Sequence, residues 1–271
     1  MDKIAIFGVP RSGTTWLSQI LNSHPDVALR FQPLFSYGHK GSLFEQSSAE
    51  EIRVFFEEIF CTQDAFALMA TEMQKNYPVF RKAVTPTHIV FKETRYLNLI
   101  ENILIQCSEV KIIGIVRNPL AVMASWILAP KEFNSVWDIN SEWRGAPSKN
   151  QNRPEEFYGF DKWHESAEAF LRFKIQFPQQ FFLVRYDELN RAPLDTTRKL
   201  FDFCGLEVCD QVEDFLSASK SRHDPDPYSV FRAKASDDSW QGVLPDEIAK
   251  QIMVELKNTT LDIFLQGDKN A

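Results

Sequence analysis

Residues 3–17 read KIAIFGVPRSGTTWL, and this stretch decides the fold. Its first part, residues 3–7, is a short apolar run that predicts a buried β-strand, and residues 14–22 carry apolar side chains at helical spacing. The loop between them holds two glycines, Gly8 and Gly13. A loop that joins a strand to a helix points backbone N–H groups and the positive end of the helix dipole at one spot. The stretch therefore predicts an anion-binding loop.

This loop differs from an ATP-binding loop at one decisive position. Gly8 and Gly13 have the spacing of the pattern G-x-x-x-x-G-K-[ST], but Thr14 stands where the lysine should be. That lysine contacts the β- and γ-phosphates of a nucleoside triphosphate. Its absence, together with Arg11 inside the loop, favours a shorter anion such as a 5′-phosphosulfate. A P-loop kinase or nucleotide hydrolase of unusual sequence, and a non-catalytic nucleotide- or glycan-binding module, are the alternatives.

Beyond the loop, short β-type runs alternate with helical patterns. Strands are predicted at residues 89–92, 110–116 and 181–186. Helices are predicted at residues 50–60, 96–106, 119–128 and 193–205. This alternation predicts an α/β fold, a P-loop-like three-layer domain with a central, mainly parallel sheet flanked by helices. We expect a single domain over residues 1–271.

Residues 130–159 interrupt the alternation. They combine three prolines and several polar residues with five aromatic residues. A flexible linker would hold fewer aromatic residues. We therefore expect an ordered excursion that lies over the carboxyl edge of the sheet, where α/β proteins bind ligands.

Composition and charge narrow the class of protein. The chain has 271 residues, with 30 basic and 37 acidic side chains and a net charge of −7, which argues against nucleic-acid binding. No run approaches the roughly 20 apolar residues that cross a bilayer, and the apolar start is too short for a signal peptide. These features predict a cytoplasmic protein with no transmembrane segment. The four cysteines have neither CxxC spacing nor companion histidines, so no metal site is predicted.

Three blocks of sequence together resemble the sulfotransferases that use 3′-phosphoadenosine 5′-phosphosulfate (PAPS). The first block, VPRSGTTWL at residues 9–17 followed by HPDV at 24–27, is similar to the 5′-phosphosulfate loop of the carbohydrate, tyrosylprotein and bacterial branches. The second, IIGIVRNP at 112–119 through Ser125, resembles the family's 3′-phosphate-binding strand, loop and helix. The third, LVRYDEL at 183–189 with FCGL at 203–206, resembles its late strand and helix.

The resemblance implies in-line transfer of a sulfuryl group from PAPS to an acceptor hydroxyl, with release of adenosine 3′,5′-bisphosphate (PAP). The acceptor would be a small molecule or a glycan, and no metal is implied. In such a reaction positioning and charge stabilisation dominate.

The donor site is assigned to residues of the first two blocks and to one of the third. The residues expected to bind PAPS are Arg11, Ser12, Gly13, Thr14, Thr15, Trp16, Arg117, Ser125 and Tyr186. Arg117 ends a buried strand and can fork two hydrogen bonds onto phosphate oxygens, while Ser125, about two helical turns on, can add a hydroxyl. Arg11 is expected to stabilise the charge on the leaving 5′-phosphate. Lys92 matches a family lysine that lies against the transferring sulfonate.

The general base is less well defined. Related enzymes carry a glutamate after the His-Pro-Asp stretch, and the matching position here is Gln32, whose amide cannot accept a proton at neutral pH. Either Gln32 only orients the acceptor or another residue is the base. Glu93 is the catalytic candidate beside Lys92, and His39 is a second one because its intrinsic pKa is close to 7. In an extended strand Glu93 and Lys92 would face opposite ways, which counts against a catalytic role for Glu93. A structural salt bridge with Arg95 or Lys92 is an equally open role for it.

The aromatic excursion carries the prediction for the acceptor. Its rings, above all Trp137 and Trp143, can stack on the apolar face of a pyranose while neighbouring amides bind the hydroxyls. This mixture predicts a sugar hydroxyl as the acceptor, and Gln32 and His39 are the other residues expected at the acceptor site. The alternative is that these rings only anchor the long loop to the core.

Overall fold

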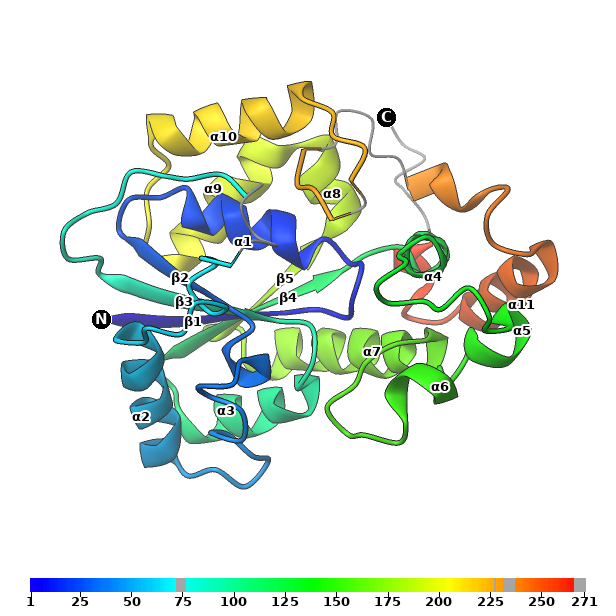
Figure 1. Ribbon diagram of the computed structural model, residues 1–271, viewed down its shortest axis with the longest axis horizontal. Coiled ribbons are helices and arrows are strands. Elements are labelled where there is room, and N and C mark those ends of the chain that lie inside the picture. The colour runs from blue at the N-terminus through cyan, green and yellow to red at the C-terminus, as the bar shows by residue number, and fades with distance from the viewer. Residues whose placement is uncertain (72–76, 227, 232–236, 266–271) are drawn as a thin grey trace.

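A computed structural model describes residues 1–71, 77–226, 228–231 and 237–265 of the chain. Within these residues lies one five-stranded sheet, with β1 (Asp2–Phe7) at its centre. The other strands are β2 (Val27–Phe31), β3 (His88–Glu93), β4 (Val110–Val116) and β5 (Phe181–Arg185). The strand order is β2-β3-β1-β4-β5, and every neighbouring pair is parallel (Figure 1). The predicted α/β fold with a central parallel sheet is confirmed.

Helices cover both faces of this sheet (Figure 1). One layer contains α1 (Thr14–Asn22), α8 (Tyr186–Arg191), α9 (Pro193–Cys204) and α10 (Asp210–Ser221). The opposite layer contains α2 (Ala49–Phe60), α3 (Ile100–Gln106) and α7 (Phe160–Gln176). At the right of Figure 1 lie α4 (Pro119–Ile127), α5 (Ile139–Glu142), α6 (Pro147–Asn150) and α11 (Asp246–Leu256). Short 3₁₀ helices lie at Pro33–Phe35, Leu97–Leu99, Asp237–Trp240 and Asp262–Phe264.

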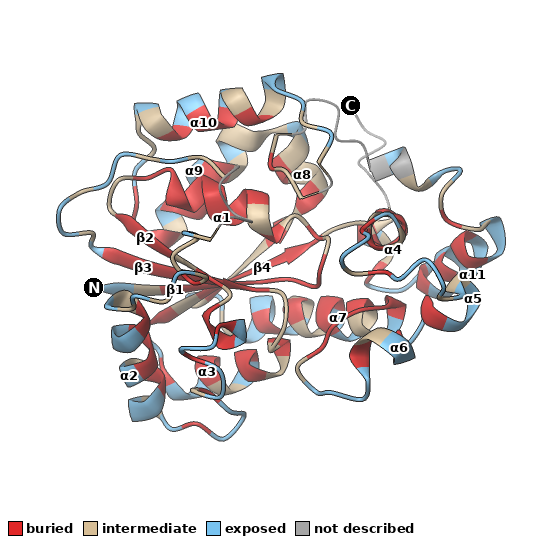
Figure 2. Cartoon of the chain, viewed as in Figure 1, coloured by how far each residue is buried: buried red, intermediate tan, exposed pale blue. Residues whose placement is uncertain are grey.

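The strands bury side chains on both faces because helices cover both. In β1, Ile4 and Ile6 pack into the hydrophobic cluster beneath α1, whereas Ala5 and Phe7 pack into the cluster on the opposite face. A strand buried on both sides needs a nearly continuous apolar sequence, which is what β1 and β4 have. Figure 2 shows the result, a buried sheet inside helices whose outer faces are exposed.

Local signals at the ends of several elements act as expected. Asn118 caps α4, since its side-chain oxygen accepts a hydrogen bond of 2.9 Å from the backbone N–H of Leu120. Gly205 ends α9 in the left-handed conformation, with φ of 80°. The helix predicted at residues 96–106 is instead a 3₁₀ turn followed by α3. Among the described residues, no helix combines the length and the apolar character needed to cross a bilayer.

The strand order reverses beside β1. The chain leaves β1 for β2 and β3 on one side, and then crosses to β4 on the other side. Open α/β sheets bind ligands at the carboxyl ends of the strands where the order reverses in this way. The loop predicted to bind an anion leads out of β1 at this point.

Candidate active site

The loop after β1 is closely packed at its two glycines. A Cβ atom on Gly8 would lie 2.7 Å from the side chain of Ile115, which is closer than real contacts allow. Gly13 precedes α1 with φ of 90°, and a Cβ there would lie 2.6 Å from the ring of Tyr186. Arg11 is also left-handed, with φ of 72°. A side-chain-bearing residue held in this region stores strain, and such strain concentrates at functional sites.

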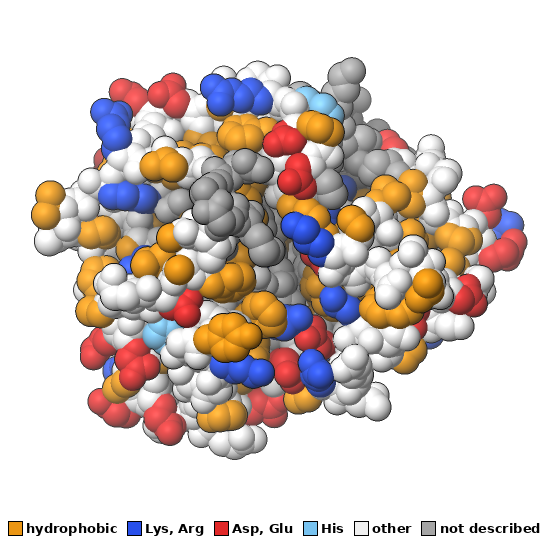
Figure 3. Space-filling model, viewed as in Figure 1, with side chains coloured by type: hydrophobic (Ala, Val, Ile, Leu, Met, Phe, Trp, Pro, Cys, Tyr) orange, Lys and Arg blue, Asp and Glu red, His pale blue; other side chains and the backbone are white. Residues whose placement is uncertain are grey.

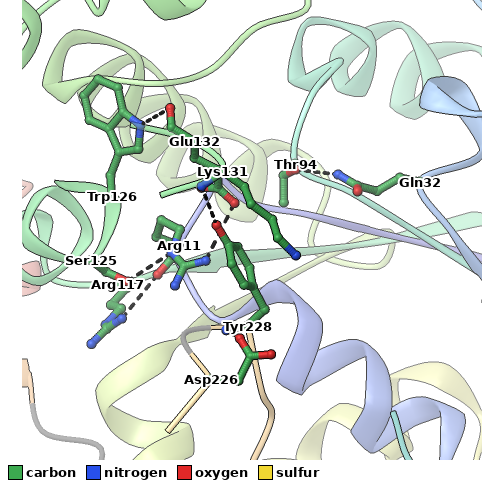
Figure 4. A network of polar contacts seen from close by, with 10 residues as sticks. All are labelled: Arg11, Gln32, Thr94, Arg117, Ser125, Trp126, Lys131, Glu132, Asp226 and Tyr228. Atoms are coloured by element: carbon green, nitrogen blue, oxygen red, sulfur yellow. Dashed lines mark hydrogen bonds and ion pairs between the residues drawn. The ribbon is translucent and has the colours of Figure 1, made fainter. Parts of the chain in front are cut away.

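Arg11 connects this loop to the end of β4 and to α4. Its Nε donates a 3.0 Å hydrogen bond to Oγ of Ser125, and its carbonyl oxygen accepts a 3.3 Å bond from Nη1 of Arg117 (Figure 4). The first two sequence blocks, more than 100 positions apart, therefore meet at one place.

Aromatic rings support Arg117. The guanidinium of Arg117 lies 4.5 Å from the centre of the Tyr186 ring. The backbone carbonyl oxygen of Arg117 accepts a 2.9 Å hydrogen bond from the indole N–H of Trp163. The ring of Trp16 meets Tyr186 edge-on at 6.0 Å, and its Nε1 donates to Oγ of Ser219 at 3.1 Å. The arginine is thus held on a rigid aromatic support.

The two arginines and the rings of Trp16 and Tyr186 line a cavity of about 430 Å³, within the usual size of a small-ligand site. Ten residues of the predicted site belong to its wall: Arg11, Gly13, Thr14, Thr15, Trp16, Gln32, Lys92, Arg117, Ser125 and Tyr186. On the face shown in Figure 3, lysine and arginine side chains gather near the centre of the molecule beside hydrophobic side chains.

The cavity is cationic although the chain carries a net charge of −7. Among its described lining residues there are six cationic side chains, namely Arg11, Lys92, Arg95, Arg117, Lys131 and Lys220, and one carboxylate, Glu132. This excess of positive charge suits a ligand with several negative charges. No cluster of three or more potential metal ligands is found in the described part of the chain.

Lys92 is the most buried of these cations. Its side chain leaves the carboxyl end of β3, the residue is only 3% exposed, and its Nζ lies 4.5 Å from the centre of the Phe31 ring. Burial lowers the pKa of Lys92, and the nearby charges of Glu93 and Glu132 partly offset that effect. A buried ammonium acts strongly on an anion because little water screens it.

Gln32 lies beside Lys92. It follows β2 in the left-handed conformation, with φ of 43°, and its backbone N–H donates to the carbonyl oxygen of Lys92 at 2.8 Å. Its side-chain Nε2 donates a 2.7 Å bond to Oγ1 of Thr94 (Figure 4). The amide is therefore fixed in the cavity wall, where it can orient a ligand but cannot take a proton.

Glu93 lies outside the cavity. It follows Lys92 in an extended strand, so its side chain enters the opposite face of the sheet, where Oε1 accepts a 2.9 Å bond from the backbone N–H of Leu34. Burial raises the pKa of Glu93. Within the described residues Glu93 forms no salt bridge with Arg95 or Lys92, and Arg95 instead pairs with Glu156 at 3.1 Å. Glu93 supports the segment after β2, and we do not propose it as the base.

Two further predicted residues lie away from the cavity wall. Nε2 of His39 lies 2.7 Å from Oγ1 of Thr62, and its ring packs edge-on against Phe55. Ser12 is fully buried within the loop, and its hydroxyl makes no hydrogen bond within the described residues.

The two tryptophans of the excursion also pack away from the cavity. Trp143 is buried, with its ring 5.8 Å from that of Phe160, and Trp137 meets Phe133 edge-on at 5.5 Å. These rings join the hydrophobic core, as the alternative interpretation of the excursion had it. The excursion reaches the cavity only near its two ends, through Lys131, Glu132 and Tyr158.

Sequence reasoning missed a large part of the cavity wall. The missed polar residues include Lys131, Glu132, Asn190, Ser219, Lys220 and Tyr228, and the missed aromatic residues include Phe35 and Phe66. Most of them come from loops or from α10, which reach the site only through tertiary packing. The one available signal was that Glu132 lies at the start of an excursion expected at the carboxyl edge.

The chain belongs to the sulfotransferase family, whose profile matches residues 3–210. It is 26% identical over 162 residues to mouse carbohydrate sulfotransferase 3, covering 58% of this chain and 34% of that protein. It is 24% identical over 263 residues to human carbohydrate sulfotransferase 5, covering 76% of this chain and 62% of that protein. The chain thus spans about a third of the length of the first of these relatives.

Comparison with solved structures shows the same fold. The crystal structure of mouse sulfotransferase SULT7A1 complexed with PAP superposes with a TM-score of 0.58 at 17% identity, covering 97% of this chain and 88% of that one.

Proposed function

We propose that this protein transfers a sulfuryl group from PAPS to a hydroxyl of a carbohydrate acceptor and releases PAP. The observation that carries this proposal is the convergence of the loop after β1, the Arg117–Ser125 segment and Lys92 on one cationic cavity. Membership of the sulfotransferase family supports the reaction class, and the carbohydrate sulfotransferase relatives support the acceptor class.

The donor would bind along the loop and α4. The backbone N–H groups of the loop and the N-terminus of α1 suit the 5′-phosphosulfate. Arg117 and Ser125 suit the 3′-phosphate, because a guanidinium forms paired, charge-assisted hydrogen bonds with phosphate oxygens. The rings of Trp16 and Tyr186, which line the same wall, suit the flat base of the nucleoside.

The transfer itself needs positioning and charge stabilisation. As the bond from sulfur to the 5′-phosphate oxygen breaks, negative charge grows on that oxygen, and Arg11 is the cation assigned to it. Lys92 is assigned to the oxygens of the sulfuryl group in passage. Preorganised cations in a cavity that excludes water stabilise such charge more effectively than solvent does.

An aromatic wall near Gln32 is the proposed acceptor site, in place of the tryptophans of the excursion. Phe31, Phe35 and Phe66 line the cavity there. Phe35 is 46% exposed, and the guanidinium of Arg95 lies 4.1 Å from the centre of its ring. A flat apolar surface with an amide and a guanidinium beside it is the mixture expected of a sugar site.

A binding comparison followed by a transfer assay tests this function. PAP at about 100 times its Kd should stabilise the protein by about 2.7 kcal/mol, seen as a raised Tm, whereas ATP with Mg²⁺ should not. Labelled PAPS should then deliver its sulfuryl group to members of a glycan panel. A preference for ATP with Mg²⁺ would indicate a kinase, and PAP binding without transfer to any acceptor would indicate a binding module. Transfer to phenols or peptides but not to glycans would refute the acceptor class.

Replacing Phe35 by alanine should remove one ring contact with the acceptor. Such a contact contributes about 0.5–1.5 kcal/mol, so the acceptor KM should rise about 2- to 12-fold. The affinity for PAP, measured by calorimetry, should not change. Phe44→Ala is the matched control, because Phe44 is an exposed phenylalanine outside the cavity wall. An acceptor KM that stays constant in Phe35→Ala would place the acceptor elsewhere.

A further inference from the structure

The proposed transfer leaves one chemical requirement without a residue. The acceptor hydroxyl must lose its proton, and Gln32 cannot take it. Among the described residues of the cavity wall there is no histidine, and Glu132 is the only carboxylate. Burial raises the pKa of Tyr77, Tyr158 and Tyr228, so none of these phenols is an effective base near neutral pH. The fourth tyrosine of the wall, Tyr186, lies beneath the guanidinium of Arg117 and is assigned to the donor.

Glu132 lies on a firmly held turn after α4. Its backbone N–H donates to the carbonyl oxygen of Ala129 at 2.8 Å, and its own carbonyl oxygen accepts a 3.2 Å bond from the indole of Trp126 (Figure 4). The next residue, Phe133, packs edge-on against the Trp126 ring at 5.1 Å. These contacts fix the backbone that carries the carboxylate, as a catalytic group requires.

The carboxylate itself is directed at the proposed reaction centre. Its Oε1 lies 3.7 Å from Nη1 of Arg11, the cation assigned to the leaving phosphate. Its Oε2 is buried and has no hydrogen-bond partner within the described residues. The charge of Glu132 also acts on Lys92, the cation assigned to the sulfuryl group. One carboxylate oxygen thus pairs with Arg11, and the side chain as a whole, which is 21% exposed, belongs to the cavity wall where a ligand can reach it.

We propose that Glu132 is the proton acceptor of the transfer, a role that rests on the proposed function. In this step the acceptor O–H gives its proton to the Glu132 carboxylate, and the acceptor oxygen forms the new bond to sulfur. The bond from sulfur to the 5′-phosphate oxygen breaks, and its electron pair stays on PAP beside Arg11. The proton later leaves Glu132 for solvent, so atoms and charge balance.

The surrounding cations answer the main objection to this assignment. A carboxylate repels an anionic donor, but here Arg11, Lys92 and Lys131 line the same cavity as Glu132. They keep the local charge positive while the donor and the carboxylate are both present. If Glu132 only held Arg11 in place, its replacement would mainly weaken donor binding. If it is the proton acceptor, its replacement lowers turnover at saturation instead.

The test compares Glu132→Gln with the wild type in labelled-PAPS transfer to a glycan that the wild type sulfates. Turnover at saturation should fall about 10²–10⁴-fold, the usual contribution of a general base. Affinity for PAP should stay equal or become tighter, since the amide no longer competes for Arg11. Glu109→Gln is the matched control, because it removes another carboxylate paired with an arginine, Arg53, at 2.7 Å and far from the cavity.

Two further variants separate proton transfer from positioning. Glu132→Asp keeps a carboxylate and should retain more turnover than Glu132→Gln, and added formate should partly restore Glu132→Ala but not Lys92→Met. Unchanged turnover in Glu132→Gln refutes the role of Glu132 and leaves the proposed function intact. Weakened PAP binding with unchanged turnover at saturation also refutes it, because Glu132 would then only position Arg11. A wild type that binds PAP but sulfates nothing refutes the proposed function itself.

Discussion

Replacing Lys92 by alanine is expected to lower the turnover of the donor-saturated enzyme about 10²–10³-fold, the usual effect of losing one electrostatic group at such a site. The affinity for PAP should change much less, because PAP lacks the sulfuryl group that Lys92 is proposed to contact. The burial of Lys92 against Phe31 makes the effect large, since water cannot replace the lost charge there. Turnover with saturating labelled PAPS and calorimetry with PAP measure the two quantities.

The control and the pH dependence make this prediction specific. Lys111→Ala removes a strand lysine whose Nζ also lies over a phenylalanine ring, at 5.7 Å, but at the opposite end of the sheet, and it should leave turnover unchanged. Lys92→Met keeps the apolar stem and should be as slow as the alanine variant. Because burial lowers the pKa of Lys92, wild-type turnover should fall on raising the pH sooner than an exposed lysine would allow. If the Lys92 variants bound PAP much more weakly but kept normal turnover at donor saturation, Lys92 would serve to hold the donor and its proposed role in the transfer would be wrong.

Replacing Arg11 or Arg117 by alanine is expected to weaken PAP binding about 10- to 150-fold each, from the loss of charge-assisted hydrogen bonds worth roughly 1.5–3 kcal/mol. The two effects should not add fully, because Arg117 also holds the backbone of Arg11 through a 3.3 Å bond. Calorimetry on both single variants and on the double variant gives the three values.

Arg185→Ala is the matched control for these arginines. Arg185 ends the neighbouring strand β5 with a similarly covered guanidinium, but it pairs with Asp187 at 2.8 Å and does not line the cavity. Its loss should leave PAP affinity nearly unchanged. Equal affinity in the wild type, Arg11→Ala and Arg117→Ala would rule out the proposed donor site.

Parts of the fold could be predicted because their signals are local. The continuous apolar run of β4, the Asn-Pro pair that begins α4 and the glycine that ends α9 each depend on a few adjacent residues. β2 was missed because Arg30 breaks its apolar pattern. That guanidinium is satisfied by the carbonyl oxygens of Ile59 and Phe60, both at 2.6 Å, at the end of α2. Such a compensation cannot be read from β2 alone.

The same distinction applies to the candidate site. Lys92 lies at the carboxyl end of β3, Arg117 follows β4 directly, and Arg11 lies in the loop after β1. Because the carboxyl ends of parallel strands share one edge of the sheet, the approach of these three residues to one another is implied by the fold. Glu132 lies in an irregular turn, and no strand or helix pattern indicates which way its side chain points. Trp143 shows the opposite error, since an aromatic residue in a polar segment suits a ligand wall and a core anchor equally well. Only the packing against Phe160 decides between them.

Two of the long-range hydrogen bonds at the cavity bear on how the chain folds. Arg11 and Ser125 are 114 positions apart, and Trp16 and Ser219 are 203 positions apart. Closing such long chain segments costs entropy before any contact compensates for it, which slows folding. The loop after β1 can take shape early, next to α1, but the cavity cannot be complete until α10 has packed against that helix. We therefore expect binding competence to be among the last properties that this protein gains as it folds.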